Sequence, residues 1–291
     1  MKYQHLLAIS AVMTVLLSVL IPAYAAHSGI HGVTKTSTGA LLPDTKVTAE
    51  KVNFYDYRRS AAGTATYSFN YGSGSTYLMA AMKNDYKYTK DWNVSPPVTK
   101  DWSLPSRTTY TDIKYKLVTD QNFRTDHPAH ETDANTLTLV AAEPWFKEEH
   151  TIKLVKHSYD GTFQRTTTNC DTLKTVLFNN YATSGAEGAL LIVGKNVNLV
   201  NNAGESVEGC VTTPQTSSFP IVIVKEYVTD PAKLTMHEVS HNYGLSHVRE
   251  GLGNPSIDFK TVMHKYINDP MSIKNWSPTE DDTLETQRTI Y

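Results

Sequence analysis

The sequence predicts an N-terminal all-β sandwich followed by an α/β (α+β) domain with a mixed sheet and one long helix near its C-terminal end. Residues 30–88 alternate polar and apolar side chains between Gly- and Ser-containing turns, which is typical of short strands packed as a sandwich. From residue 112 onward, apolar strand-like runs alternate with helical segments, as they do in α/β domains. The last such run, Phe219–Tyr227, is followed at once by a helical pattern that begins at Pro231.

The composition excludes several classes of protein. Of the 291 residues, 40% are hydrophobic and 19% are charged, which fits neither a disordered chain nor a coiled coil. The chain has 27 Lys and Arg against 29 Asp and Glu, a formal net charge of -2. This near-balance argues against a nucleic-acid partner held by broad charge neutralisation, so none is expected.

The first 25 residues are expected to be an export signal that is removed. Lys2 supplies the positive charge, Leu6–Ile21 the apolar run, and Ala23-Tyr24-Ala25 the small-x-small cleavage pattern. A permanent membrane anchor is the alternative, but the run is shorter than the roughly 20 apolar residues that a spanning helix needs. The mature protein is therefore expected to be secreted and extracellular, without a stable membrane span.

Two cysteines occur, Cys170 and Cys210, and in an oxidising compartment one such pair predicts a disulfide. Closing a loop of about 41 residues would stabilise the fold by roughly 4 kcal/mol in the chain-entropy model. A thiolate that binds a metal or blocks an active site is the alternative. It is disfavoured because neither cysteine belongs to a local Cys motif.

Four N-terminal segments follow one another as the strands of a known module do. They are Gly32–Thr34, Gly39–Ala49, Tyr67–Phe69 and Tyr77–Ala80. In residues and in order they resemble the carboxypeptidase regulatory-like (transthyretin-like) module. The resemblance implies a small β-sandwich and no chemistry of its own.

The prolines in Ser95-Pro96-Pro97 and Leu104-Pro105 predict a linker over residues 91–111. The expected segments are thus a signal peptide (1–25), a β-sandwich accessory module (26–90), this linker (91–111) and a second domain (112–291). In the second domain a helix is expected at Cys170–Tyr181, and strands are expected at Thr136–Ala142, Thr151–His157, Ala189–Val193 and Phe219–Tyr227.

The last predicted helix carries residues suited to metal chemistry. Asp230 is a suitable N-cap, and Pro231 suits the first helical position. His237 and His241 are four residues apart, so their imidazoles lie on one face and can share a metal ion. Glu238 sits one position further round the helix, near that metal but free to hold its water.

A third ligand follows beyond the expected end of this helix. His247 lies six residues after His241 and would point away from the metal if the helix continued. Gly244 tolerates a left-handed C-terminal cap, and the sharp turn would return His247 to the metal. Three nitrogen ligands with a fourth position open to water are typical of catalytic zinc. We therefore expect one catalytic Zn²⁺ ion, bound by His237, His241 and His247.

Residues 237–247 match the long motif H-E-x-x-H-x-x-G-x-x-H, and on this ground the chain resembles the metzincin metallopeptidases. Requiring Gly244 and His247 as well as the first two histidines lowers a chance match to roughly a few in 100,000 chains. The resemblance covers about residues 112–291. Val248, directly after the third histidine, matches none of the named branches, so the branch stays open.

The resemblance also implies two residues downstream of the motif. Metzincins have a methionine turn beneath the metal, and Met263 is the matching residue. In some branches a tyrosine two positions later reaches the metal. Here Lys265 holds that position and Tyr266 follows it, so Tyr266 is the candidate donor to the transition state.

Together these features imply a secreted zinc-dependent endopeptidase that acts on a protein or peptide substrate. The metal would acidify a water molecule, and Glu238 would take its proton and return it to the leaving amine. The substrate would lie extended along an edge strand supplied by Phe219–Tyr227 or Val207–Thr213.

Two other functions stay open. One is an inactive metallopeptidase scaffold that serves as an extracellular binding or adhesion protein. The other is a zinc hydrolase of non-peptide amides. Glu238 argues against the first, because a structural metal site needs no free base beside the metal.

Four further histidines lie outside this spacing: His127, His130, His150 and His157. A second metal site is the functional interpretation of these residues. Solvated or hydrogen-bonded histidines are the simpler one, and it is the one we expect.

Overall fold

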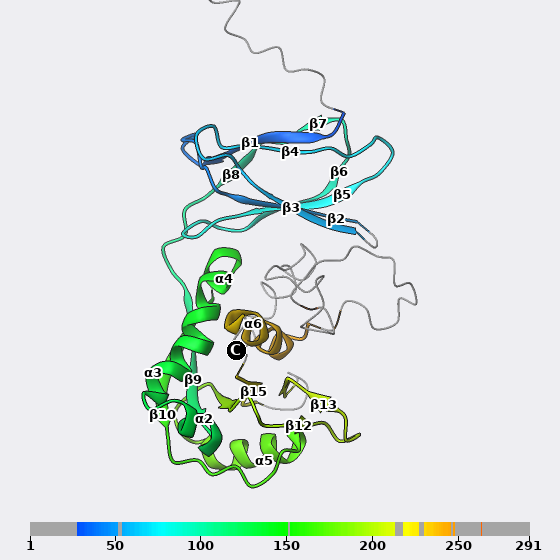
Figure 1. Cartoon of the computed structure of the whole chain (residues 1–291). Helices are drawn as coiled ribbons and strands as arrows, with labels where there is room; N and C mark the ends of the chain where they lie inside the picture. The colour runs from blue at the N-terminus through cyan, green and yellow to red at the C-terminus, as the bar shows by residue number, and fades with distance from the viewer. Residues whose placement is uncertain are drawn as a thin grey trace, which may run out of the picture.

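The structure is a computed structural model that describes residues 28–51, 54–150, 152–212, 218–226, 230–245, 247 and 263. The expected signal peptide (1–25) and Tyr266 lie outside the described residues. Within the described part of the chain, no helix has the length and apolar character needed to cross a membrane. These residues form an N-terminal β-unit and a second unit built on a mixed sheet (Figure 1).

Two four-stranded sheets form the N-terminal β-unit and enclose one apolar cluster. In one sheet β1 (Ile30–Thr36) pairs with β4 (Thr66–Phe69) on one side, and with β7 (Val98–Thr99) and β8 (Trp102–Leu104) on the other. The other sheet has the order β3-β2-β5-β6, with bounds Phe54–Arg59, Lys46–Lys51, Tyr77–Met82 and Thr89–Val94.

Alternating side chains explain why these segments are strands. In β4, Tyr67 and Phe69 face the cluster while Thr66 and Ser68 are more exposed, which is the period of two that a pleated strand imposes. Trp102 lies in the same cluster, and its indole N–H donates to the Tyr67 hydroxyl at 2.9 Å. The buried polar end of the indole is therefore satisfied inside the core.

The expected linker at 91–111 is wrong for residues 91–104, which belong largely to the two sheets. β6 pairs with β5 in one sheet, and β7 and β8 pair in parallel with β1 in the other. Ser95-Pro96-Pro97 is the crossing between the sheets, where proline is tolerated because no ladder needs its missing N–H. Such a crossing and an inter-domain linker have the same composition, so the sequence pattern did not separate them.

The second unit is built on a five-stranded sheet of order β10-β9-β11-β15-β14. The first four strands run parallel, while β14 is antiparallel to β15 and forms one edge. Their bounds are Ile152–Asp160 (β10), Thr111–Thr119 (β9), Gly188–Val193 (β11), Ile221–Lys225 (β15) and Gly209–Val211 (β14). A short ladder of β12 (Leu199–Val200) and β13 (Ser206–Val207) precedes β14.

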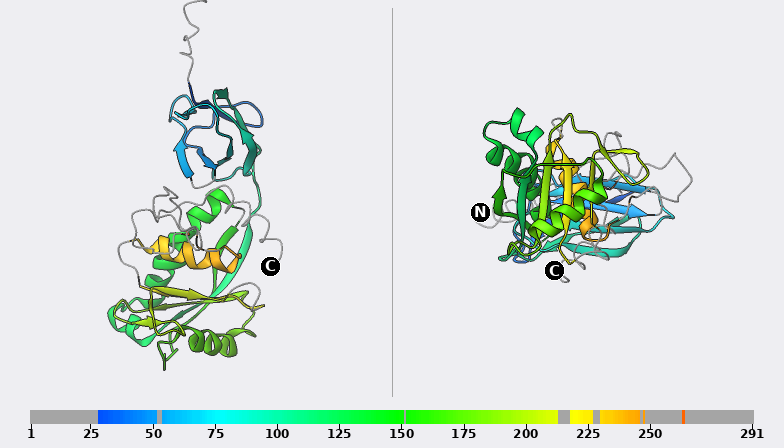
Figure 2. Two further views of the ribbon diagram at one scale, coloured as in Figure 1. Left: turned by 90° about the vertical axis from the view of Figure 1, so that its right-hand side faces the viewer. Right: turned by 90° about the horizontal axis from the view of Figure 1, so that it is seen from below.

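Helices cover both faces of this sheet (Figure 2). One face carries α2 (Gln121–Asp126), α3 (His130–Asn135), a π-helical turn η1 (Thr136–Val140), α4 (Ala141–Glu149) and α6 (Pro231–Asn242), and the other carries α5 (Cys170–Tyr181). In β11, Leu190 and Ile192 join the first cluster, whereas Leu191 and Val193 join the second. Burial on both faces is why β11 and β15 are continuous apolar runs in the sequence.

The strand expected at Thr136–Ala142 is wrong, because these residues form η1 and the start of α4. The local Thr–Leu alternation has a period of two, but burial follows a helical period, since Leu139, Ala142 and Phe146 all lie in the core. Packing of one helical face against the sheet therefore overrides the local pattern.

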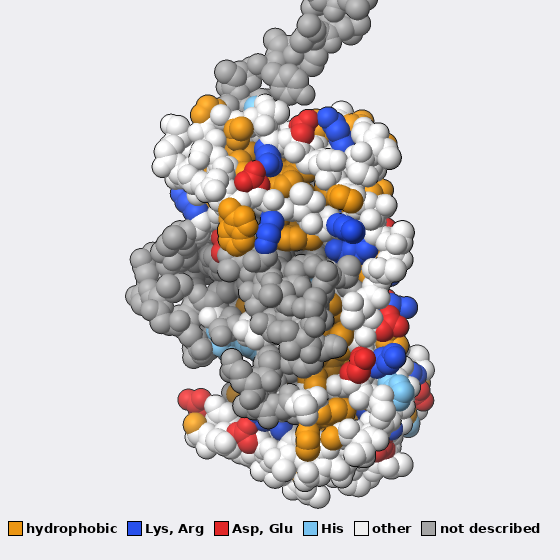
Figure 3. All heavy atoms as spheres, turned by 180° about the vertical axis from the view of Figure 1, so that it is seen from behind, with side chains coloured by type: hydrophobic (Ala, Val, Ile, Leu, Met, Phe, Trp, Pro, Cys, Tyr) orange, Lys and Arg blue, Asp and Glu red, His pale blue; other side chains and the backbone are white. Residues whose placement is uncertain are grey.

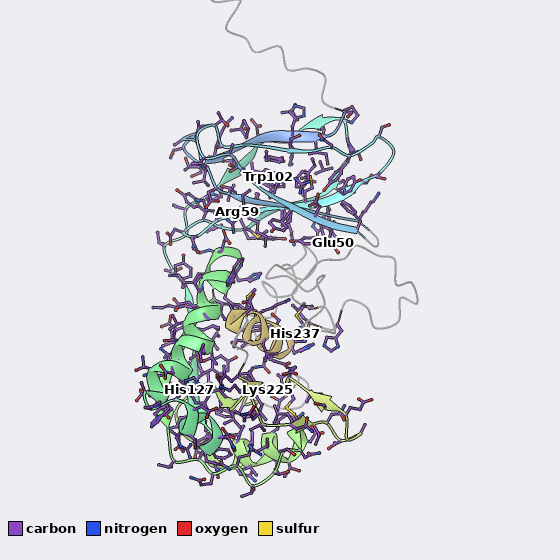
Figure 4. The ribbon with its side chains drawn as sticks, in the orientation of Figure 1. Glu50, Arg59, Trp102, His127, Lys225 and His237 are labelled. Carbon is purple, nitrogen blue, oxygen red and sulfur yellow. A yellow bond between two sulfur atoms is a disulfide. The ribbon has the colours of Figure 1, made fainter. Side chains whose placement is uncertain are left out.

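A partly buried ion pair joins the two units. Arg59 at the end of β3 donates from both terminal guanidinium nitrogens to the Glu148 carboxylate of α4, at 2.7 and 2.8 Å. Arg59 lies on the side of the β-unit that faces α4 (Figure 4). The Glu148 side chain is only 11% exposed, so water screens the pair poorly. Next to it, the Lys147 ammonium lies 5.1 Å from the centre of the Tyr110 ring.

Replacing Arg59 by methionine is expected to destabilise the fold by about 1–3 kcal/mol, because Glu148 is left buried without its partner. Urea unfolding of Arg59→Met, Glu148→Gln and the double variant measures this, and the double variant should lose less than the two single variants combined. Lys35→Met removes one partner of the exposed Lys35–Asp101 pair and serves as the control, with an expected change under about 0.5 kcal/mol. Strictly additive losses would show that the pair does not couple the units.

Candidate metal centre

Helix α6 begins as the sequence predicts, with one difference. Asp230 occupies the N-cap position and Pro231 the first turn, but the Asp230 side chain accepts no capping bond from the helix. The Asp230 backbone carbonyl instead accepts a hydrogen bond from the Lys233 N–H at 3.2 Å. The favourable residue types are therefore in place, while the side-chain cap itself is not formed.

One side of α6 is anchored in the core, and this fixes the direction of its histidines. Met236, Val239 and Tyr243 lie in the apolar cluster between the helix and the sheet. His237 lies on α6 (Figure 4). His241 lies one helical turn further along the same helix. Rotation of the helix about its axis would expose three apolar side chains, so the ring positions are set by packing.

The structure brings three imidazoles together. The Nε2 atoms of His237 and His241 are 3.2 Å apart, and His247 Nε2 lies 3.1 Å from the first and 3.2 Å from the second. The three nitrogens thus form a nearly equilateral triangle. Among the described residues, this is the cluster in which His, Cys or carboxylate ligand atoms converge closely enough to hold a metal ion.

Gly244 allows the chain to turn back after α6. Its φ is +85°, in the left-handed region that glycine reaches without a Cβ penalty, so the cap expected at this position is present. The Gly244 N–H donates to the His241 carbonyl at 3.0 Å, and the Leu245 N–H donates to the Ser240 carbonyl at 3.3 Å. These bonds end the helix, and the chain then places His247 beside the two helical histidines.

The donor set fits a zinc ion. His241 Nδ1 lies 2.6 Å from the Leu245 carbonyl oxygen, so Nδ1 carries the proton and Nε2 keeps its lone pair for a metal. Two nitrogen ligands of a tetrahedral zinc, each about 2.0–2.1 Å from the ion, lie roughly 3.3 Å apart. The observed separations of 3.1–3.2 Å are close to this value. Three neutral imidazoles also leave one tetrahedral position for a further ligand.

Glu238 is buried between α6 and the edge strand β14. A Cβ atom placed on Gly209 would lie 2.5 Å from Glu238 Oε1 and 2.8 Å from its Cγ, so any other residue at that position would force the Glu238 side chain to shift. Burial raises the pKa of Glu238 to about 8, and the positive charge of Lys174 acts in the opposite direction. A metal cation beside the carboxylate would favour its charged form, as Lys174 does.

β14 is the edge of the sheet nearest this carboxylate. The Lys225 N–H donates to the Glu208 carbonyl and the Thr212 N–H to the Ile221 carbonyl, so alternate peptide groups, those of Gly209 and Val211, point away from β15. Of the two expected substrate edges, the segment 207–213 contains this strand. The segment 219–227 is excluded as an edge, because β15 is paired on both sides.

Cys170 and Cys210 form the expected disulfide. The bond joins the first residue of α5 to the middle residue of β14. With both sulfurs bonded, no thiolate remains to bind a metal, so that alternative is excluded.

Met263 is fully buried in the same apolar cluster as the packed side of α6. Tyr266 lies outside the described residues, so its role as a donor stays a prediction. Sequence reasoning missed two neighbours of Glu238, namely Gly209 and Lys174. Both lie far from the motif along the chain, and no local pattern marks them.

Two of the other histidines are engaged elsewhere, as expected. The His127 ring stacks on Phe123 with centroids 4.2 Å apart, and its nitrogens lie 3.3 and 3.1 Å from carboxylate oxygens of Asp133 and Glu226. His130 Nδ1 lies 2.6 Å from the Tyr159 hydroxyl oxygen. Within the described residues these rings do not converge on a second metal site.

No family model matches this chain, and no curated protein matches it. Among solved structures, metalloproteinase-II from Bacteroides fragilis is similar over 63% of this chain and 55% of its own, with 14% identity and a TM-score of 0.37. The match thus spans about half the length of that protein. A likeness of this size carries no argument about function, which must rest on the residues of the site.

Replacing Gly244 by alanine is expected to destabilise the fold by about 1 kcal/mol and to weaken zinc binding roughly tenfold, because the left-handed turn presents His247. Thermal unfolding and competition with a chromogenic chelator measure the two effects. Gly63→Ala is the matched control, since an added Cβ meets no atom within 4 Å there. Unchanged zinc affinity in Gly244→Ala would contradict the role given to this turn.

Proposed function

We propose that this chain is a secreted zinc-dependent endopeptidase of the metzincin type. The observation that carries the proposal is the triangle of Nε2 atoms, 3.1–3.2 Å apart, two of them on the helix that also carries the buried Glu238. His237, His241 and His247 would hold the metal, and Glu238 would be the catalytic base. The disulfide and the predicted export signal are compatible with an extracellular location.

A zinc ion in this site would act as a Lewis acid, polarising the scissile carbonyl and making water more acidic. Glu238 accepts the proton of the attacking water as the oxygen adds to the carbonyl carbon. The same carboxyl then donates this proton to the leaving amine as the C–N bond breaks. Burial between α6 and β14 keeps the carboxylate in one place for both transfers.

The edge strand supplies a way to bind a peptide. An extended substrate segment can add to β14, because the N–H and C=O of Gly209 and the N–H of Val211 point away from β15. Backbone pairing of this kind tolerates many side chains, which suits a protein or peptide substrate. It also favours a peptide over a small non-peptide amide, which would use only the metal and Glu238.

Further parts of the proposal rest on the sequence resemblance. Met263, buried in the cluster beneath α6, would be the floor of the metal site, and Tyr266 would donate to the transition state. The β-unit would be an accessory module attached through Arg59 and Glu148. A nucleic-acid partner is not proposed, since acidic and basic side chains are interspersed on the face seen in Figure 3.

The inactive-scaffold alternative differs from the proposal at Glu238 alone. A protein that only binds would gain nothing from a buried carboxylate on the helix that carries two of the metal ligands, and the burial itself costs free energy. The carboxylate therefore favours catalysis over mere binding.

Purified mature protein is expected to contain about one zinc per chain and to cleave casein or gelatin in a chelator-sensitive way. Glu238→Gln should keep its zinc and lose turnover by at least about 10³-fold, because the amide cannot accept the proton. Elemental analysis and a fluorescent casein assay give the two readouts. Glu187→Gln is the matched control, because this carboxylate directly precedes the central strand β11 and accepts from the Lys114 N–H of β9.

Three outcomes would reject the proposal in different ways. Folded protein without metal would remove the site. Zinc with no cleavage of any peptide would favour the inactive scaffold. Cleavage of small non-peptide amides, with no cleavage of peptides, would favour the non-peptide hydrolase.

A further inference from the structure

Helix α5 holds the edge strand β14 at two points. The first is the disulfide between Cys170 and Cys210. The second is Lys174, whose ammonium donates to the Val211 carbonyl at 3.3 Å and to the Asp171 carboxylate at 2.5 Å. Residues 170 and 174 are one helical turn apart, so both attachments leave α5 from the same face.

Helix α5 is itself held firmly in the fold. The side chains of Leu173 and Leu177 are buried in the cluster between α5 and the sheet. The helix start is capped by Asn169, whose side-chain oxygen accepts from the Thr172 N–H at 3.0 Å. α5 is therefore a fixed body to which a weaker element can be attached.

β14 is such a weaker element. It has three residues and, among the described residues, a single neighbouring strand, β15. Edge segments with few contacts open at low free-energy cost. The two attachments act on Cys210 and Val211, so they restrain most of the strand.

The restraint on β14 matters for catalysis because this strand also contacts Glu238 of α6. Gly209 lies against the Glu238 side chain, and a Cβ at this position would displace the carboxylate. The Gly209 N–H and C=O point away from β15, whereas the Val211 carbonyl accepts from the Lys174 ammonium. A shift of β14 would therefore move Glu238 and the backbone of a paired substrate together.

We propose that the Cys170–Cys210 disulfide and Lys174 form a clamp that positions β14, and through Gly209 the Glu238 carboxylate, for catalysis. The inference rests on the proposed peptidase function. Cys170, Cys210, Lys174 and Gly209 are positioning residues, since they act through Glu238 and the strand. A chain without the disulfide is expected to fold and bind zinc but to hydrolyse peptides poorly.

The clamp is tested with the full mature chain in four variants: Cys170→Ser/Cys210→Ser, Lys174→Met, Lys174→Arg and Gly209→Ala. Each is compared with wild type for kcat and KM on a quenched fluorescent peptide, zinc affinity, and amide exchange of residues 209–211. Lys195→Met is the matched control, because Lys195 is half exposed and its ammonium lies 3.8 Å from Asp126, away from β14.

The double cysteine variant is expected to lose roughly 10–100-fold in kcat/KM, because a displacement of about 1 Å at the reacting groups costs that much. Lys174→Met should lose about three- to tenfold and Lys174→Arg should recover most of it, since arginine keeps a donor for the Val211 carbonyl. Gly209→Ala should lose at least about tenfold in kcat. In all four variants zinc affinity should stay within about twofold of wild type, because no ligand is touched.

Faster amide exchange at 209–211 in the cysteine and Lys174→Met variants is the signature that separates positioning from general stability. The clamp is overturned if these variants unfold at lower temperature yet keep the wild-type kcat/KM and exchange rates when folded. If the cysteine variant does not fold, the comparison of Lys174→Met with Lys174→Arg tests the clamp by itself. If wild type itself cleaves no peptide, the proposed function fails, and unchanged exchange at 209–211 would then overturn the clamp separately.

Discussion

The candidate site depends on holding three imidazole nitrogens within 3.1–3.2 Å of one another. Lone pairs at this separation repel, so the arrangement is unfavourable without a cation at its centre and favourable with one. Three independent constraints impose it. Helical spacing aligns His237 with His241, and the left-handed turn at Gly244 brings His247 back beside them. The Leu245 carbonyl keeps the proton of His241 on Nδ1, so its Nε2 is free to bind a metal.

The reversal of one strand determines what surrounds this cluster. Four parallel strands are covered by helices on both faces, while antiparallel β14 closes the sheet with an edge beside α6. Glu238 is consequently enclosed by protein on the side of β14, and the strand still has peptide groups to offer. Burial of Glu238 and the position of β14 at the edge of the described sheet therefore have one structural cause.

The β-unit is tied to the same assembly through α4. The Arg59–Glu148 pair ends on a helix that packs against α6, and α6 carries the first two histidines. A largely shielded, bidentate pair is much more sensitive to loss of one partner than an exposed pair is. The β-unit is thus connected to α6 through α4 alone in this chain of contacts.

The sequence by itself determined the elements whose cause is local. The motif at 237–247, the glycine cap, the helix at 170–181 and the Val- and Ile-rich buried strands all follow from spacing, backbone freedom or apolar runs. Local pattern failed at Thr136–Ala142, where packing of a helical face prevailed, and at 91–104, where a proline-rich crossing has the composition of a linker.

Only the tertiary structure decided that β14 is the edge, that Gly209 confines Glu238 and that Lys174 reaches Val211. These contacts join residues far apart in the chain. Their existence depends on strand order and on the reversal of β14, which no short segment of sequence encodes.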